Sequence, residues 1–303
     1  MAVVPDPAGV APAAGTTRTT DGRPRPADPG RPGRSALVTT IVLALCSLTV
    51  LLPLYLTLTM AFKTPEQSVD GNGFSLPSPL NPQSFVDAWN LVGFPTAFVI
   101  SALVAAASVF GVIVLGSLAA YAIARNWDRR LFRYSYYYLL AAMFIPFPVI
   151  ALPQVKLTAL LSLDNPVGVA VLHVLFQLSF SVLLYSAFLR SIPAELEESA
   201  RLDGATTWQV FTQLIFPLLA PMNATVGIFA FLAAWNDFMM PSLITADPDL
   251  QTIPVIQQIF QSSFSTDYNV AFASYLMAMA PTIVVYVFAQ RWVMSGVVRG
   301  AVK

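Results

Sequence analysis

The sequence predicts an all-α polytopic membrane protein with six membrane-spanning helices. The chain has 303 residues, of which 56% are hydrophobic and only 11% are charged, whereas a typical soluble domain carries roughly 25% charged residues. Six apolar segments reach the ~20 residues that crossing a bilayer requires. Strands exposed to lipid would leave backbone groups unpaired, so we expect all six segments to be helices. The formal net charge of zero gives no indication of a nucleic-acid partner.

The first 34 residues differ in composition from the rest of the chain. They are rich in Pro, Gly, Ala, Thr and Arg, and they show no apolar periodicity. Such a segment cannot bury enough apolar surface to offset its ordering entropy, so we predict that residues 1–34 are a disordered tail. The apolar run that follows, 36–62, exceeds the roughly 7–15 residues of a signal-peptide core and is interpreted as a span.

Prolines interrupt several of the predicted spans. The spans cover residues 36–61, 95–124, 135–157, 167–189, 212–236 and 271–293. The third, fifth and sixth contain or begin with Pro146, Pro148, Pro153, Pro217, Pro221 and Pro281. Proline removes a helical hydrogen bond and can kink a helix. These kinks either free carbonyl groups along a pathway or are packing kinks that the neighbouring helices tolerate.

Lys and Arg residues indicate the orientation of the spans, because they accumulate on the cytoplasmic side. All but two of the 16 lie in the tail, after the second and fourth spans, or near the C-terminus. The exceptions are Lys63 and Lys156. We therefore expect both termini to be cytoplasmic, together with the loop between the fourth and fifth spans.

That loop carries the most specific local signals in the chain. Ser191 is predicted to cap a helix that has Pro193 in its first turn. Three acids, Glu195, Glu197 and Glu198, follow near the N-terminus of this helix, where the helix dipole favours negative charge.

The predicted helix ends at Gly204, because glycine readily adopts a left-handed backbone. Thr206 and Gln209 have the spacing of a capping box, so a second helix begins there and continues into the fifth span. Leu196 and Ala200 share a helix face that can rest on a partner or on the membrane surface. Two short helices meeting at a glycine form an elbow that can transmit movement from a soluble domain; a solvated, capped loop is the alternative interpretation.

The elbow resembles the signature loop of bacterial ABC-importer permeases. That pattern is Glu-Ala-Ala, a Gly four residues after the second Ala, and then Ile-x-Leu-Pro. Its counterparts here are Glu198-Ser199-Ala200, Gly204, Leu214 and Phe216-Pro217. The three substitutions, at Ser199, Leu214 and Phe216, keep size or apolar character. Asp203-Gly204-Ala205 is also typical of the family.

Other segments resemble the carbohydrate branch of this family, specifically the six-span partner of the maltose-type permease pair. They are Lys63-Thr64-Pro65-Glu66, Trp235-Asn236-Asp237-Phe238 and Gly300-Ala301-Val302-Lys303. The resemblance covers residues 36–303 and implies a type I ABC-importer permease fold, with a permease domain at 35–303, a coupling loop at about 191–211 and a cytoplasmic tail at 1–34.

The resemblance also implies partners. The chain would pair with a second permease subunit in the bacterial inner membrane, and an extracellular solute-binding protein would deliver a sugar. A cytoplasmic ATPase dimer would bind the elbow and hold the ATP and Mg, with no cofactor on this chain. The implied ATPase-coupling residues are Glu195, Glu197, Glu198, Ala200, Asp203, Gly204 and Ala205.

The sequence offers no catalytic or metal-binding motif. It lacks the Gly-x4-Gly-Lys-Ser/Thr phosphate loop, so ATP hydrolysis would require another subunit. One His and one Cys are too few for a zinc cluster, and no Gly-x-Ser-x-Gly elbow presents a nucleophile.

Polar side chains at membrane depth usually face protein or water and are the candidates for a substrate pathway. They are Gln177, Asn223, Trp235, Asn236 and Asp237. Amide and acid groups can bind sugar hydroxyls, and an indole can stack on a sugar ring; hydrogen bonding between helices is the alternative. His173 shares a helix face with Gln177, and for it interhelical packing is favoured.

Other transport functions stay open at this stage. The solute could be a polyol, a glycerol phosphate or an amino acid. An ion-coupled secondary transporter would need intramembrane ionisable groups and, typically, inverted repeats. This chain has one deep candidate acid and no evident repeat.

Overall fold

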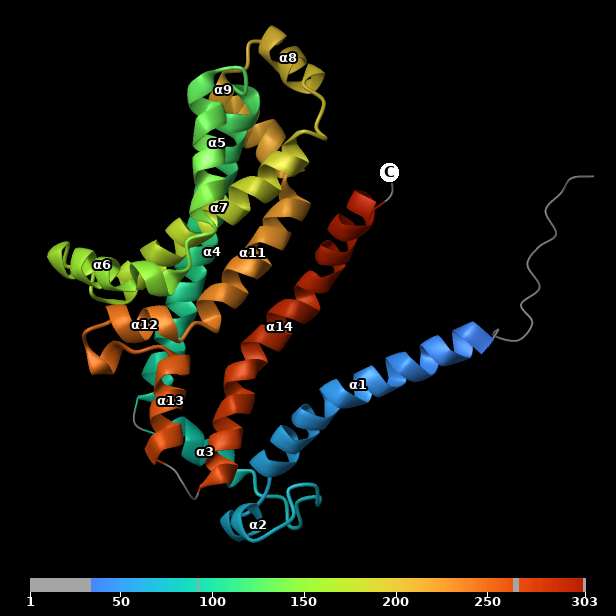
Figure 1. Cartoon of the computed structure of the whole chain (residues 1–303), viewed down its shortest axis with the longest axis vertical. Helices are drawn as coiled ribbons and strands as arrows, with labels where there is room; N and C mark the ends of the chain where they lie inside the picture. The colour runs from blue at the N-terminus through green and yellow to red at the C-terminus, as the bar shows by residue number, and fades with distance from the viewer. Residues whose placement is uncertain (1–33, 92, 264–266, 302–303) are drawn as a thin grey trace, which may run out of the picture. The chain divides into compact units, whose positions relative to one another are not determined.

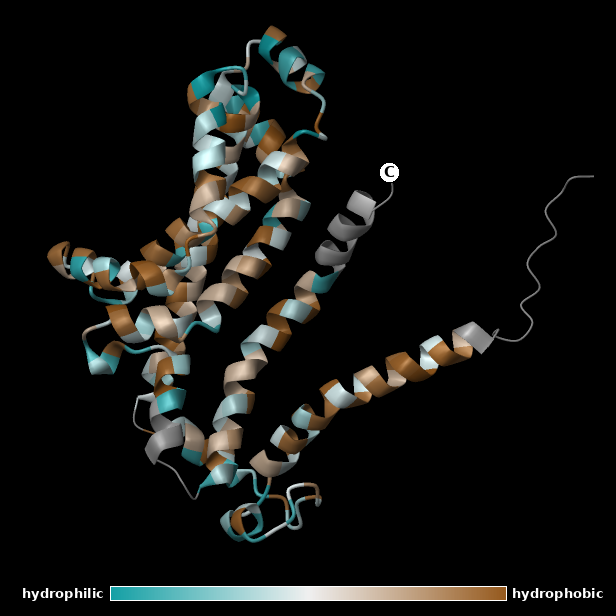
Figure 2. Ribbon diagram, viewed as in Figure 1, coloured by the Kyte–Doolittle hydropathy of each residue, from teal (hydrophilic) through white to brown (hydrophobic). Residues whose placement is uncertain are grey.

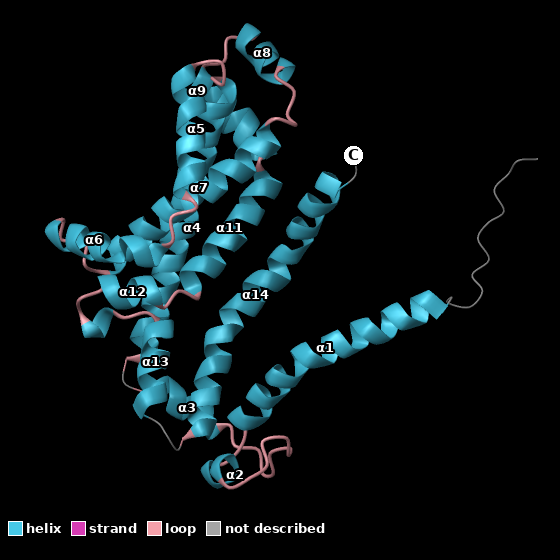
Figure 3. Ribbon diagram, in the orientation of Figure 1, coloured by secondary structure: helices cyan, strands magenta, loops and turns pink. Residues whose placement is uncertain are grey.

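The computed structural model describes residues 34–91, 93–263 and 267–301, all of whose regular elements are helical (Figures 1 and 3). The predicted disordered tail lies outside the described residues apart from Arg34, where α1 (Arg34–Ala61) begins. The chain divides into residues up to Val50 and a compact unit from Leu51 to Lys303. The prediction of an all-α membrane protein is confirmed.

Among the described residues, four helices are long and apolar enough to cross a membrane without interruption. Their apolar stretches are Ala36–Ala61 in α1, Phe94–Arg125 (α4), Pro166–Leu189 (α7) and Tyr268–Gln290 in α14 (Tyr268–Ala301). They correspond to the first, second, fourth and sixth predicted spans. Figure 2 shows the hydrophobic residues that cover these long helices.

The third and fifth predicted spans are not continuous helices. The third consists of α5 (Arg130–Ala142) and α6 (Phe147–Leu160), which are bent by 104°. The break covers residues 143–146 and ends at Pro146, with Pro148 in the first turn of α6. A residue that precedes proline is disfavoured in the α-helical region, which favours a break here. The part of the chain that the structure describes therefore reaches six candidate spans only if each bent pair is counted as one.

The fifth predicted span is bent by 74° near its start. It comprises α9 (Thr207–Gln209), a π-helical turn η1 (Val210–Ile215), α10 (Phe216–Leu218) and α11 (Ala220–Trp235). Pro217 and Pro221 flank the bend and lack the N–H groups that a continuous α-helix needs. Phe216-Pro217, the end of the sequence motif, thus marks a change of helix direction.

The core of the compact unit is the packing of α4 against α7, with α11 against both and α14 against α11. Glycines allow the first pair to approach closely. A Cβ at Gly116 would lie 2.5 Å from Ser181 Oγ, and one at Gly111 would lie 2.6 Å from Val174 Cγ2. Small residues at such a crossing let two membrane helices pack backbone to backbone.

Shorter helices lie in the half of the unit away from the elbow, with α12 near the middle and α2 and α3 at the end (Figure 1). They are α2 (Pro65–Val69), α3 (Gln83–Asn90), α12 (Met239–Ile244), η2 (Pro248–Leu250) and α13 (Ile253–Ser263). Ser101 Oγ accepts a hydrogen bond from Ile253 N at 2.8 Å, which joins α13 to α4. Asn269 Nδ2 donates to Ser84 Oγ at 2.9 Å and joins α14 to α3.

Candidate coupling site

The elbow begins with α8 (Glu195–Leu202), which starts later than predicted. Ser191 does not cap it: its Oγ donates instead to Phe188 O at 2.7 Å. The residue before α8 is Ala194, which has no side-chain acceptor. The prediction of a Ser191 cap was wrong, because the hydroxyl bonds back to the preceding turn of α7.

Gly204 ends α8 as predicted. Its φ of +89° is left-handed, and two backbone hydrogen bonds close the end of the helix. Gly204 N donates to Arg201 O and Ala205 N donates to Ala200 O, both at 3.0 Å. This is a Schellman motif, in which a glycine lets the chain reverse while the last carbonyls stay bonded. No atom lies within 4 Å of a Cβ built at Gly204, so the backbone conformation alone requires glycine.

The second arm of the elbow starts with the predicted capping box. Gln209 N donates to Thr206 Oγ1 at 3.3 Å, and Thr206 N donates to Gln209 Oε1 at 2.8 Å. These reciprocal bonds satisfy the first N–H groups of α9. Because α9 continues through η1 and α10 toward α11, the elbow is continuous with the bent fifth span.

Glu197 fastens the elbow to the membrane helices. It is only 3% exposed. Arg125 Nε lies 2.6 Å from its Oε1, and Tyr121 Oη donates to its Oε2 at 2.8 Å. Both partners belong to the last turns of α4. A buried charge is tolerated when it is paired and hydrogen-bonded in this way, so α8 is held to α4 by an ion pair inside the protein.

The other predicted coupling residues separate into two groups. Glu195, Glu198, Asp203 and Gly204 are exposed, whereas Ala200 and Ala205 are half-buried and pack against the core. Leu196, which is predicted to share a helix face with Ala200, is 45% exposed.

Two exposed apolar residues of the elbow were not among the predicted coupling residues. Leu202 is 90% exposed and Trp208 is 63% exposed. Their exposure in a charged segment makes both side chains available for contact with a partner. The sequence feature that could have identified these two residues is their apolar character within a charged segment. Figure 2 shows α8 as a largely hydrophilic helix with hydrophobic positions.

Three of the predicted pathway residues make contacts between helices. Tyr185 Oη donates to Asn223 Oδ1 at 2.8 Å, joining α7 to α11. Gln177 Nε2 donates to Ala230 O at 3.3 Å across the same pair of helices. Trp235 Nε1 donates to Ala278 O at 3.0 Å, joining α11 to α14. These contacts match the alternative interpretation, in which the polar groups hold helices together.

Asn236 and Asp237 directly follow α11, at the end of that helix that points away from the elbow. Asp237 Oδ1 accepts from Met239 N at 3.0 Å, and its Oδ2 lies 3.4 Å from His173 Nε2 of α7. Asn236 is exposed. Beside it is a cavity of about 150 Å³ whose lining includes Trp235, Gln257 and Tyr275. Of the predicted pathway residues, Trp235 and Asn236 are therefore the two that share a cavity.

The sequence is similar to those of known transport proteins. A family model described as "Binding-protein-dependent transport system inner membrane component" matches residues 112–299. The chain is 32% identical over 268 residues to the multiple sugar-binding transport system permease protein MsmG of Streptococcus mutans, covering 87% of this chain and 95% of the relative. It is 29% identical to the melibiose/raffinose/stachyose import permease protein MelC of Bacillus subtilis, covering 89% and 98%.

The fold is also similar to that of solved transporter structures. A chain of a bacterial ABC transporter involved in the import of the acidic polysaccharide alginate superposes with a TM-score of 0.74 at 20% identity, covering 86% of this chain and 99% of that one. A chain of the alginate transporter in complex with its pentasaccharide-bound periplasmic protein gives a TM-score of 0.63 at 17% identity, covering 84% and 92%.

Proposed function

Because the chain belongs to the family of binding-protein-dependent transport system inner membrane components, we propose that it forms part of the pathway of an ATP-driven importer for an oligosaccharide. Relatives named for melibiose, raffinose and stachyose and for diacetylchitobiose support this substrate class. The chain itself is a multi-pass permease and not an enzyme; ATP and Mg would bind a separate ATPase dimer.

The observation that carries the proposal is the anchored elbow. An ATPase that moves α8 would move α4 as well, because Glu197 joins the two helices through Arg125 and Tyr121. It would also act on α11, since α9 to α11 follow the elbow without a loop. Packed side chains, ion pairs and rigid helices of this kind can carry coupling between a docking surface and the spans.

The docking surface is proposed to be the outer face of the elbow. Its acids, Glu195, Glu198 and Asp203, would pair with basic groups of the ATPase, and Leu202 would enter an apolar pocket. Apolar anchors surrounded by polar groups are the usual source of interface affinity. Ala200, Gly204 and Ala205 would shape the turn that presents them. This assignment puts the elbow and both termini in the cytoplasm, as the distribution of Lys and Arg favours.

The substrate end is proposed to lie around Trp235 and Asn236, where α11 ends beside α13 and α14. The exposed amide of Asn236 has the chemistry that sugar hydroxyls require, and the buried Trp235 would hold the wall beside it in place through its bond to Ala278. Gln177, Asn223 and Asp237 would act indirectly, by holding α7 and α11 in place. A second permease subunit would complete the pathway and an extracellular solute-binding protein would deliver the sugar. The solved complex of the alginate transporter with its periplasmic protein supports the latter partner.

Copurification tests the docking surface. Tagged wild-type chain is isolated from its host in mild detergent beside Gly204→Asp, which strains the turn at φ +89°. Gly73→Asp is the matched control, since it introduces the same side chain in the segment between α2 and α3. We expect a P-loop ATPase and a second permease with the wild type and the control. The ATPase should be lost from Gly204→Asp. Wild-type chain that never retains an ATPase would contradict the proposal.

A further inference from the structure

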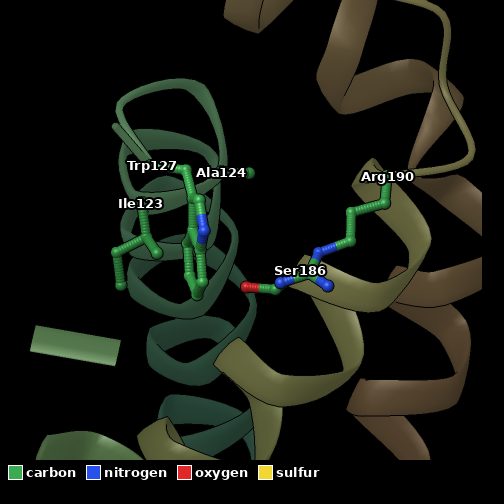
Figure 4. A pocket seen from close by; sticks show the side chains of 5 residues that line it. All are labelled: Ile123, Ala124, Trp127, Ser186 and Arg190. Carbon is green, nitrogen blue, oxygen red and sulfur yellow. The ribbon is translucent and has the colours of Figure 1, made fainter. Parts of the chain in front are cut away.

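A cavity of about 350 Å³ lies between the ends of α4 and α7, outside the elbow surface described above (Figure 4). Its lining residues are Ile123, Ala124, Trp127, Ser186 and Arg190. The first three come from α4 and the turn after it, and the last two from the end of α7. None of them takes part in the ion pair that anchors α8.

Ser186 contributes a buried hydroxyl to this cavity. The residue is 2% exposed, and among the described residues its Oγ has no hydrogen-bond partner. Figure 4 shows the hydroxyl pointing toward Trp127 on the opposite wall. An unpaired buried hydroxyl is costly to a folded protein, so a polar group that reaches this cavity would gain a partner already in position.

Arg190 contributes a cation that the described residues do not neutralise. Its guanidinium carbon lies 5.1 Å from the centre of the Trp127 ring. Within the described ranges no carboxylate is within ion-pair distance of it. Stacking on an aromatic ring fixes the plane of a guanidinium while leaving its N–H groups able to bind an oxyanion in a bidentate manner.

The surroundings fit an anionic group at the surface of a membrane. Both helices are spans that end here, and Arg129, Arg130 and Arg133 follow α4 in the sequence. The Trp127 ring also lies 5.3 Å from that of Tyr136 and belongs to an aromatic cluster. Aromatic clusters of this kind are typical of the level of lipid headgroups, and basic pockets between spans bind phospholipid headgroups.

We propose that this cavity binds a phosphate group, with the Arg190 guanidinium as its counter-ion and the Ser186 hydroxyl as a hydrogen-bond donor. Ile123 and the Trp127 ring would contact the apolar part of a ligand that has one. The phosphate belongs either to an anionic phospholipid or to a free phosphate ion. The proposal rests on the side chains at the ends of α4 and α7. It is independent of which solute the protein transports.

Native mass spectrometry of the full chain, purified in a neutral detergent, tests the site. Phosphatidylglycerol is titrated against diacylglycerol with the same acyl chains, which lacks the phosphate. We expect tighter binding of the phospholipid. Arg190→Gln should weaken that binding by ~10-fold or more and Ser186→Ala by several-fold, as expected for the loss of a charged and a neutral hydrogen bond.

Matched variants separate binding from folding. Lys156→Gln removes a positive charge from an exposed residue of α6, outside the cavity, and should bind as the wild type does. Arg190→Lys keeps the charge but loses the stacked, bidentate guanidinium, and we expect it to restore only part of the binding that Arg190→Gln loses. If Arg190→Gln fails to fold, Ser186→Ala, which deletes a single oxygen, still gives the answer.

Inorganic phosphate distinguishes the two sources. If it displaces phosphatidylglycerol from the wild type but not from Ser186→Ala, the site accepts free phosphate. If it does not compete while both variants lose the lipid, the ligand is a phospholipid. Equal binding of phosphatidylglycerol and diacylglycerol, or wild-type affinity in Arg190→Gln and Ser186→Ala, would overturn the proposal.

Discussion

At the scale of single residues, two neighbouring acids of the elbow have different environments. Glu197 is buried against Arg125 and Tyr121, whereas Glu198 is exposed. Glu197 therefore stabilises the fold, and Glu198 is available to bind a partner. Both acids lie in the same predicted motif, and only their contacts distinguish them.

Neutralising these acids one at a time should give opposite results. Glu197→Gln weakens the buried ion pair and should lower the free energy of unfolding by about 1–3 kcal/mol. Glu198→Gln should leave thermal stability unchanged and reduce ATPase retention. Thermal unfolding in detergent and copurification measure the two effects. If Glu198→Gln were the less stable of the two variants, the assignment of the buried acid would be wrong.

Gly204 gives a prediction based on backbone conformation alone. Its left-handed φ is unfavourable for a residue with a Cβ, but there is free space around it. Gly204→Ala should therefore weaken ATPase binding through strain of roughly 1–2 kcal/mol. Gly204→Asn should weaken it less, because Asn also occurs at this helix-end position. Equal loss in both variants would point to steric contact with the partner instead of strain.

Local signals made part of the elbow predictable. Gly204 and the Thr206–Gln209 box depend on residues no more than five positions apart, and both were identified from the sequence. The sequence motif predicts that Glu197 contacts the ATPase. In the structure it contacts Arg125 and Tyr121, which lie 72 and 76 residues earlier in the chain. Contacts of that kind depend on how α4 packs beside α8, which the sequence pattern does not specify.

At the scale of helices, the elbow depends on the close packing of α4 and α7. Gly116 lies at this contact, and its absent Cβ makes room for Ser181 and Tyr185. Hydropathy predicted these two spans with good boundaries, because both are straight and uninterrupted. It did not predict the 104° and 74° bends of the third and fifth spans. Prolines marked where bending was possible, but the angles depend on tertiary packing.

Filling the α4–α7 contact should loosen the scaffold beneath the elbow. Gly116→Val would force the helices apart and should cost about 1–3 kcal/mol, as overpacking of a core does. Gly227→Ala is the control, because its Cβ would lie 3.4 Å from Ile113 Cδ1, close to an ordinary contact. Thermal unfolding of both variants measures the difference. A Gly116→Val chain as stable as the wild type would show that this crossing is not tightly packed.

At the scale of the whole molecule, we propose that the elbow docks the ATPase and that the opposite ends of the spans contact the substrate. Two asparagines test that division, because each ends a span and donates to the carbonyl four residues earlier. Asn236 Nδ2 donates to Leu232 O and Asn126 Nδ2 donates to Ala122 O, both at 2.9 Å. Only Asn236 lines the cavity beside Trp235.

Uptake of a radiolabelled oligosaccharide by cells distinguishes these positions. Asn236→Ala should raise the KM for uptake several-fold, because a lost hydrogen bond to an uncharged group is worth about 0.5–1.5 kcal/mol. Asn126→Ala should leave the KM unchanged. An equal effect of both substitutions would mean that Asn236 acts only through the end of its helix.

Cross-linking from the elbow tests the central claim most directly. Cys46 is the only cysteine, so Cys46→Ser gives a background in which Leu202→Cys carries a photoreactive group at a site that is 90% exposed. Leu76→Cys, at a residue that is 73% exposed between α2 and α3, is the control. We predict that illumination joins the Leu202→Cys chain to an ATPase subunit and the control chain to none. Absence of the ATPase adduct from Leu202→Cys, or an equal adduct from Leu76→Cys, would contradict the account.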